Sequence, residues 1–140
     1  MTSTGSPAPG SGGRTRVLVC DDDERVRESV TEMLATQDFE VETAERAVDA
    51  IQKVMRGTYQ VLLLDLKLPG LGGLDAISVV RRFDERLPII VMTGNASFET
   101  EQAVRAAGVF YYLVKPFRLD ELTQAVRAAA RFRESARRRG

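Results

Sequence analysis

The sequence predicts an α/β fold, a three-layer doubly wound (βα)5 sandwich in which helices cover both faces of one parallel sheet. Short runs of Val, Ile and Leu recur along the chain, as is typical of strands that are buried on both faces. The longer segments between these runs carry apolar residues at helical spacing. Because crossovers between parallel strands are right-handed, this alternation favours a doubly wound sheet with a helix after each strand.

Strands and helices alternate in chain order. We expect the strands at residues 17–20, 39–43, 61–64, 88–92 and 110–114. Apolar residues mostly three or four positions apart predict the helices that follow these strands: Val26, Val30, Met33 and Leu34; Ala47, Ile51, Val54 and Met55; Leu74, Ile77 and Val80; Ala103, Val104 and Ala107; and Leu119, Leu122, Val126 and Ala129.

The chain of 140 residues has the length of one ordinary domain, and its 44% hydrophobic and 29% charged residues are typical of a globular protein. Residues 1–14 are rich in Gly, Ser, Thr and Pro and are expected to form a flexible leader. Residues 15–131 would form the domain, and residues 132–140 a basic extension or the start of a linker. No apolar stretch has the length of a membrane span and no signal peptide is recognisable, so we expect a cytoplasmic protein.

Two compositional features exclude common classes of site. The chain has no histidine, which excludes Ser–His and Cys–His catalysis and histidine-rich zinc sites. The single cysteine, Cys20, is expected to be a small buried apolar residue rather than a redox sensor. Five of the last ten residues are arginine, but no aromatic platform or groove-reading motif accompanies them, so direct nucleic-acid binding is not expected.

Polar residues follow four of the five expected strands. Asp21, Asp22 and Asp23 follow the first strand, Asp65 the third, Thr93 the fourth and Lys115 the fifth, where Pro116 comes next; Asp22 or Asp23 could equally cap the first helix. Because ligands bind at the carboxyl ends of the strands in such sheets, we expect these side chains to share one edge.

Crowded carboxylates repel one another, and a hard divalent cation relieves the repulsion, so the sequence predicts a Mg²⁺ site at this edge. With the metal and Lys115 holding a phosphoryl group, Asp65 could attack phosphorus and become an aspartyl phosphate.

This set of residues resembles the receiver domain of two-component response regulators. The resemblance is carried by the Asp21–Asp22 pair, by Asp65 in LLLDLKLPG, by Thr93 in VMTG and by Lys115 in VKPF, and it covers nearly the whole expected domain. It implies a flavodoxin-like parallel sheet of order 2-1-3-4-5.

The resemblance also implies a role for each carboxylate. Asp65 is the expected phosphoacceptor, and Asp21 and Asp22, together with Asp65 and the backbone carbonyl of Lys67, are the expected Mg²⁺ ligands. The side chains of Lys67 and Asn95 each lie two residues beyond a site residue and could reach the phosphoryl group or its attacking water.

A switch is implied as well. Thr93 would move to bind the phosphoryl group, Lys115 would pair with it, and Tyr112 would swing inward as Thr93 moves. The surface that responds would be the fourth helix, the fifth strand and the fifth helix, including residues 97–107 and 119–131.

The resemblance therefore implies a signalling switch rather than a conventional enzyme. The domain would take a phosphoryl group from a sensor histidine kinase or phosphotransfer protein, catalysing only its own phosphorylation and dephosphorylation. It would then change its affinity for a downstream protein or for an output domain missing from this chain, and a homodimer through the fourth and fifth helices stays open.

Two alternatives belong to other classes. An aspartate-nucleophile phosphatase would need a second aspartate two residues after Asp65 as acid and base, where this chain has Lys67. A receiver-like module that binds partners without phosphorylation is disfavoured, because all the expected site residues are present.

Overall fold

The computed structural model describes residues 14–94 and 97–139 of the chain, with side chains up to residue 136. The expected leader, apart from Arg14, and Asn95 lie outside the described residues. In chain order the elements are β1 (Thr15–Cys20), α1 (Glu24–Ala35), β2 (Phe39–Ala44), α2 (Ala47–Arg56), β3 (Val61–Asp65), α3 (Gly73–Phe83), β4 (Ile89–Thr93), α4 (Phe98–Ala106), β5 (Tyr111–Val114) and α5 (Leu119–Arg139).

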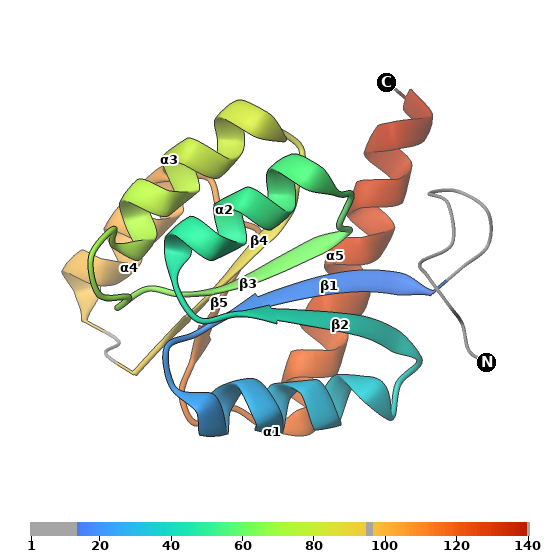
Figure 1. Ribbon diagram of the computed structural model, residues 1–140, viewed down its shortest axis with the longest axis horizontal. Helices are drawn as coiled ribbons and strands as arrows, with labels where there is room; N and C mark the ends of the chain where they lie inside the picture. Colours follow the sequence, from blue (N-terminus) through green and yellow to red (C-terminus); the bar gives the residue numbers. More distant parts are fainter. Residues whose placement is uncertain (1–13, 95–96, 140) are drawn as a thin grey trace.

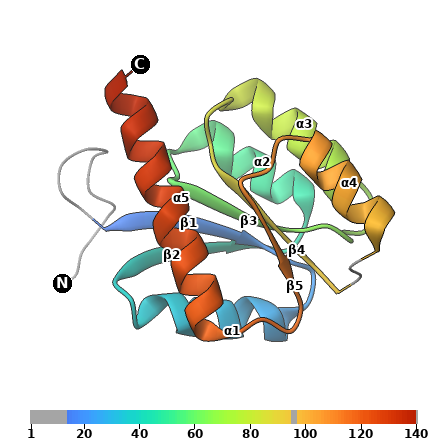
Figure 2. The same ribbon diagram turned by 180° about the vertical axis from the view of Figure 1, so that it is seen from behind.

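The strands form one five-stranded sheet with the order β2-β1-β3-β4-β5, and every neighbouring pair is parallel. Helices α1 and α5 cover one face, and α2, α3 and α4 cover the other (Figures 1 and 2). The predicted fold class and strand order are confirmed. The central position of β3 explains why its run of leucines is buried on both faces.

Two apolar layers hold the helices to the sheet. Successive residues of a strand point to opposite faces, so Leu62 and Leu64 of β3 contact the α2–α3–α4 layer while Val61 and Leu63 contact the α1–α5 layer. Helix α2 is attached mainly by Ala47, Ala50, Ile51 and Val54, which lie on one side of the helix. Met55 belongs to the same sequence pattern but is 56% exposed, because it lies at the margin of this buried stripe.

The strand bounds agree with the predicted ones to within two residues. Asp65 and Thr93 are the last residues of β3 and β4 rather than the first residues after them. The reason is the hydrogen-bond ladder: Leu66 still donates its N–H to the carbonyl of Met92, at 2.9 Å, so pairing continues past the apolar run. Both polar side chains are therefore positioned by the sheet itself.

Helix α5 is 21 residues long and continues to Arg139, into the residues predicted to be an extension. Arg133, which is only 6% exposed, forms a two-pronged salt bridge with Asp84 just after α3, at 2.8 and 2.5 Å. Ala136 is also buried. The described part of α5 is thus attached to the domain up to Ala136, and none of the helices in residues 14–94 and 97–139 is long and apolar enough to cross a membrane.

Candidate functional site

The polar strand ends meet at the carboxyl edge of the sheet, as predicted. Asp21 follows β1, Asp65 ends β3, Thr93 ends β4 and Lys115 follows β5, and these are the strands next to one another in the sheet. Asp21 and Thr93 are fully buried and Asp65 is 5% exposed, whereas Asp22 is exposed. The sheet therefore delivers one polar group from each of four adjacent strands to a single place.

Three carboxylates lie within reach of a common ligand. One oxygen from each of Asp21, Asp22 and Asp65 lies within 4.8 Å of the others. Burial and the negative charge of Asp21 raise the pKa of Asp65, and Lys115 offsets this only in part. Carboxylate oxygens are the donors that hard divalent cations such as Mg²⁺ prefer, so the residues present fit a magnesium site.

Lys115 bridges the two buried carboxylates. Its Nζ lies 2.7 Å from Asp21 Oδ2 and 3.5 Å from Asp65 Oδ1. Burial by itself would lower the pKa of Lys115, but its hydrogen bond to Asp21 and the charges of both aspartates raise the pKa above its ordinary value. Lys115 therefore carries its charge at neutral pH. Its backbone N–H donates to the carbonyl of Thr93, at 2.7 Å, which ties the ends of β4 and β5 together.

The loop after β1 holds Asp21 in place. The N–H of Asp23 donates to Asp21 Oδ1 at 2.9 Å, and Arg27 Nη1 donates to the backbone carbonyl of Asp21 at 2.7 Å. Asp23 is the N-cap of α1, since its carboxylate accepts the N–H of Arg25 at 2.9 Å. Of the two aspartates considered as caps, Asp23 has that role, which leaves Asp22 beside the other site carboxylates.

Sequence reasoning missed Arg27. The signal that could have found it is its charge, because a basic residue in the first turns of a helix opposes the helix dipole and needs another reason to be there. The structure supplies that reason in the bond from Arg27 to the Asp21 carbonyl.

Lys67 contributes its backbone to the site. Its N–H donates to Asp65 Oδ1 at 3.3 Å, while its side chain is exposed. The loop that carries Lys67 is held close to the sheet at Gly73, where a Cβ would come within 2.7 Å of the Leu66 Cα. Glycine is therefore needed at this position for α3 to begin so near the end of β3.

Thr93 and Tyr112 share one face of the sheet. Tyr112 pairs with Val91 in the β4–β5 register, and Thr93 lies two residues after Val91, so both side chains point toward the α2–α3–α4 layer. Tyr112 is half-buried against that layer, and burial followed by the charge of Glu101 on α4 raises its pKa. The predicted switch pair is therefore diagonal across neighbouring strands.

Cys20 is fully buried beside the acidic residues. Burial, with the charges of Asp21 and Asp65, raises its pKa to about 12. A thiol that stays protonated at neutral pH is a poor nucleophile, which agrees with the predicted role as a small buried apolar residue.

Comparison with known sequences identifies the family. Residues 17–127 match the family model described as the response regulator receiver domain. The chain belongs to this family. A receiver domain of this kind is a component of two-component signal transduction, as the sequence motifs predicted.

Two curated response regulators illustrate the relationship. The response regulator MprA of Mycobacterium leprae is 39% identical over 116 residues, which are 83% of this chain and 51% of that protein. The regulatory protein AtoC of Escherichia coli is 34% identical over 114 residues, which are 81% of this chain and 25% of that protein. The receiver domain described here thus spans about half the length of one relative and a quarter of the other.

Solved structures agree with this assignment. The crystal structure of a CheY-like response regulator receiver domain protein from Methanospirillum hungatei superimposes with a TM-score of 0.84 and 26% sequence identity. The match covers 89% of this chain and 99% of that one, so the whole receiver fold is shared.

Proposed function

We propose that this receiver domain accepts a phosphoryl group on Asp65 from a histidine kinase or a phosphotransfer protein. The single observation that supports this best is the position of Asp65, a buried carboxylate at the end of the central strand, 3.5 Å from Lys115 and grouped with Asp21 and Asp22. In the transfer, an Asp65 oxygen forms a bond to phosphorus as the bond between phosphorus and the donor histidine nitrogen breaks. These 140 residues contain no histidine, so the donor imidazole lies outside them.

We assign Mg²⁺ to the three carboxylates, with the backbone carbonyl of Lys67 as a further ligand. A bound Mg²⁺ would neutralise the crowded negative charge and that of the incoming phosphoryl group. The protein's own contribution is to fix the geometry: Lys115 holds a positive charge beside Asp65, and Asp23 and Arg27 orient Asp21.

The phosphoryl group then acts on the switch residues. It adds about −1.5 to −2 charge and several acceptor oxygens at Asp65, which attract the hydroxyl of Thr93 and the ammonium of Lys115. Because Tyr112 lies on the same face as Thr93, movement of Thr93 opens space into which Tyr112 can turn. The response would be read on α4, β5 and α5, where Phe98, Tyr111, Val114 and Leu119 are exposed. These apolar side chains suit a contact with a downstream protein, an output domain or a second copy.

The phosphatase alternative is not favoured. Two residues after Asp65, where such a phosphatase needs a second aspartate as acid and base, this chain has Lys67. The phosphorylation-independent alternative gains no specific support from the site, since Asp65 and Lys115 lie close enough to act on one phosphoryl group.

Phosphorylation can be measured directly. We expect incubation with Mg²⁺ and a small-molecule donor such as acetyl phosphate to add one phosphate, seen by intact-mass spectrometry. The isosteric variant Asp65→Asn should not acquire it, and chelation of Mg²⁺ with EDTA should abolish it in the wild type. Addition of phosphate to Asp65→Asn at the wild-type rate would contradict the proposal.

The switch can be tested without turnover. Mg²⁺ with beryllofluoride, which mimics a phosphoryl group on Asp65, should shift the NMR signals of Thr93 and Tyr112 in the wild type and not in Asp65→Asn. A wild type that acquires phosphate but shows no such shifts would instead favour the phosphorylation-independent module.

A further inference from the structure

A concave site lies at the opposite edge of the sheet from the aspartates. It is a cavity of about 490 Å³, called here the amino-edge cavity, which is bounded by the α3–β4 turn, the α4–β5 turn and the late part of α5. Pro88 comes directly before β4 and Phe110 directly before β5. The cavity therefore belongs to the amino ends of strands whose carboxyl ends carry Thr93 and Lys115, and it lies outside the proposed phosphorylation site.

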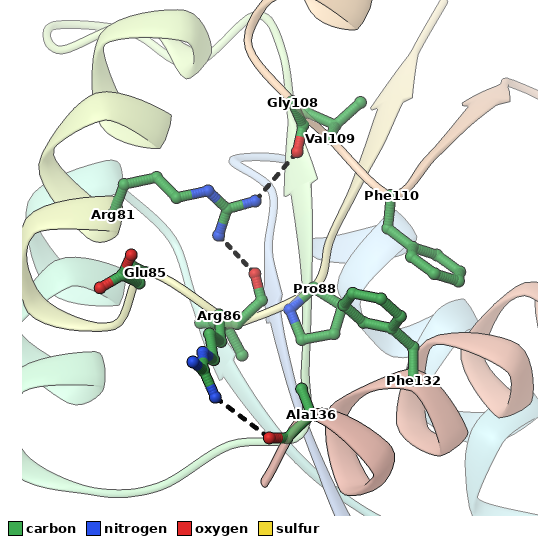
Figure 3. A pocket seen from close by; sticks show the side chains of 10 residues that line it. Arg81, Glu85, Arg86, Pro88, Gly108, Val109, Phe110, Phe132 and Ala136 are labelled. Carbon is green, nitrogen blue, oxygen red and sulfur yellow. Dashed lines mark hydrogen bonds between the residues drawn. The ribbon is translucent and has the colours of Figure 1, made fainter. Parts of the chain in front are cut away.

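One wall of the cavity is apolar. The rings of Phe110 and Phe132 have their centroids 5.5 Å apart at an interplanar angle of 45°, and Pro88 lies beside them (Figure 3). Phe132 is 46% exposed, so a large apolar surface faces water next to a hollow. Ligand pockets typically measure about 300–1,000 Å³, so the cavity is large enough for one aromatic or aliphatic side chain. Filling it would remove apolar surface from water.

The other wall carries charge. Arg81, Glu85 and Arg86 lie across the cavity from the two phenylalanine rings (Figure 3). Arg81 donates to the carbonyls of Leu87 and Gly108, and Arg86 donates to the carbonyl of Ala136 at 3.0 Å. These acceptors are uncharged, so the bonds hold both guanidinium groups in place without cancelling their charge.

The surroundings add to the positive charge of this edge. Asp84 is already paired with Arg133, and the last ten residues of the chain contain five arginines and one glutamate. Helix α5 passes the cavity with Arg131 exposed, and its backbone continues to Arg139. The amino edge is therefore basic, whereas the carboxyl edge holds Asp21, Asp22 and Asp65. A negatively charged partner would be attracted to the amino edge and repelled from the other.

We propose that the amino-edge cavity binds an acidic peptide segment of a partner protein. One aromatic or aliphatic side chain of the segment lies between Pro88, Phe110 and Phe132, and flanking carboxylates contact Arg81 and Arg86. Shape and charge both support this occupant: a nucleic-acid duplex would use the arginines, but its bases are paired and stacked and none is free to fill an aromatic-walled hollow.

The test uses the full chain and a short synthetic peptide with one phenylalanine between runs of aspartate and glutamate. We expect saturable binding by fluorescence anisotropy, with NMR shifts at Val109, Phe110 and Phe132. Two control peptides separate the contributions: alanine in place of phenylalanine, or asparagine and glutamine in place of the acidic residues, should each weaken binding strongly. Affinity should also fall as salt is raised.

Variants of the chain locate the site. Phe132→Ala should weaken binding about tenfold, because truncating an anchoring aromatic removes a central contact. Leu119→Ala is the matched control, since Leu119 lies on the same helix with a similar exposure of 45% but far from the cavity. Thermal unfolding of each variant shows whether it is folded.

Two neighbouring charge variants should act in opposite directions. Arg86→Gln retains a donor for the Ala136 carbonyl and should weaken binding about threefold, while Glu85→Gln removes a repulsive charge and should strengthen it about twofold. Asp65→Asn should bind like the wild type, so this result is independent of the phosphorylation proposal.

Several outcomes would overturn the proposal. These are the absence of binding by the acidic phenylalanine peptide, equal binding by Phe132→Ala and wild type, or NMR shifts confined to α4 and the start of α5. A DNA duplex that binds the wild type and Phe132→Ala equally well, while the peptide does not bind, would instead identify the edge as a phosphate-binding surface.

Discussion

Asp21 is the most constrained side chain of the site. Lys115 binds its Oδ2, the N–H of Asp23 binds its Oδ1, and Arg27 binds its backbone carbonyl. Lys115 is separated from Asp21 by 94 positions in the sequence, so this contact exists only because β1 and β5 lie in one sheet. Burial of a carboxylate is tolerated where such partners satisfy it. Arg27 is the partner whose contribution can be isolated, because it binds the backbone carbonyl of Asp21 and not its carboxylate.

We predict that Arg27→Gln slows phosphorylation by raising the Mg²⁺ concentration needed for half-maximal rate. The expected change is about tenfold, the lower end of what partners of metal ligands contribute elsewhere. The rate of phosphate incorporation from acetyl phosphate, measured against Mg²⁺ concentration, gives this value. Arg25→Gln is the matched control, since the Arg25 side chain lies on the same helix but is 90% exposed. A Mg²⁺ dependence in Arg27→Gln equal to that of the wild type would show that Arg27 has no positioning role.

Tyr59, away from the site, should make the stability of the domain depend on pH. Its hydroxyl donates to Glu42 Oε1 at 2.9 Å, and burial together with this bond raises the pKa of Tyr59 from 10.0 to about 12. The unfolded chain therefore releases this proton near pH 10 while the folded chain retains it. The contribution of protonated Tyr59 to the free energy of unfolding is therefore complete below pH 10 and is lost as pH rises toward 12.

Urea denaturation of wild type and Tyr59→Phe between pH 8 and pH 12 tests this sign. Their difference in free energy of unfolding should be constant up to about pH 10 and then change by about 2 kcal/mol in favour of the variant. A difference that stays constant up to pH 12 would contradict the raised pKa.

At the scale of the elements, α5 shows what the sequence predicted and what it did not. The helical spacing of Leu119, Leu122, Val126 and Ala129 predicted the helix, but the pattern ends at Ala129 while the helix continues to Arg139. Past that point the contacts with the domain include the Arg133–Asp84 pair across 49 positions, the Phe110–Phe132 ring contact and the bond from Arg86 to the Ala136 carbonyl. Hydrophobic periodicity contains no information on such a pair, because two charged residues are ordinarily read as exposed surface.

Removing Asp84 and removing Arg133 should lower the free energy of unfolding by different amounts. Arg133 has a side-chain exposure of 7% and Asp84 of 23%. Asp84→Ala leaves a buried guanidinium without its partner and should cost about 3 kcal/mol in free energy of unfolding, whereas Arg133→Met leaves a carboxylate that water can reach and should cost less. Chemical denaturation measures both, and a double mutant cycle gives the coupling. A larger loss in Arg133→Met would show that the unpaired Asp84 carboxylate costs more than the unpaired guanidinium.

In the site too, residues that follow a local sequence pattern were predictable, and contacts that depend on the folding of distant loops were not. Asp65, Thr93 and Lys115 were predictable because each follows an apolar run, and the carboxyl ends of parallel strands meet. The N–H of Lys67 on Asp65 and the Arg27 contact were not, since they depend on how two loops turn after the strands end. The amino-edge cavity was equally hidden, because its walls come from three segments that no local pattern connects.

At the scale of the whole molecule, the sheet separates two layers that should respond differently to phosphorylation. Thr93 and Tyr112 face the α2–α3–α4 layer, whereas α1 and α5 cover the other face. Within the first layer, α4 is the least firmly attached helix: Val104 is its one buried residue, and Phe98 is 70% exposed. Few buried contacts mean a low free energy of local opening, so α4 is the element that a change at Thr93 can shift most easily.

We therefore predict a polarised response to Mg²⁺ and beryllofluoride in hydrogen-exchange mass spectrometry. Peptides from α4 and β5 should change their exchange rates by about threefold or more, which corresponds to a change in local stability of only about 0.7 kcal/mol. Exchange rates of peptides from α1 and from residues 131–136 of α5 should stay unchanged. Helix α1 packs in the α1–α5 layer, on the face of the sheet away from Thr93, and the Arg133–Asp84 pair attaches residues 131–136 to the domain. Asp65→Asn should show no change anywhere. A uniform change across both layers would mean that the phosphoryl mimic stabilises the whole domain rather than switching one side of it.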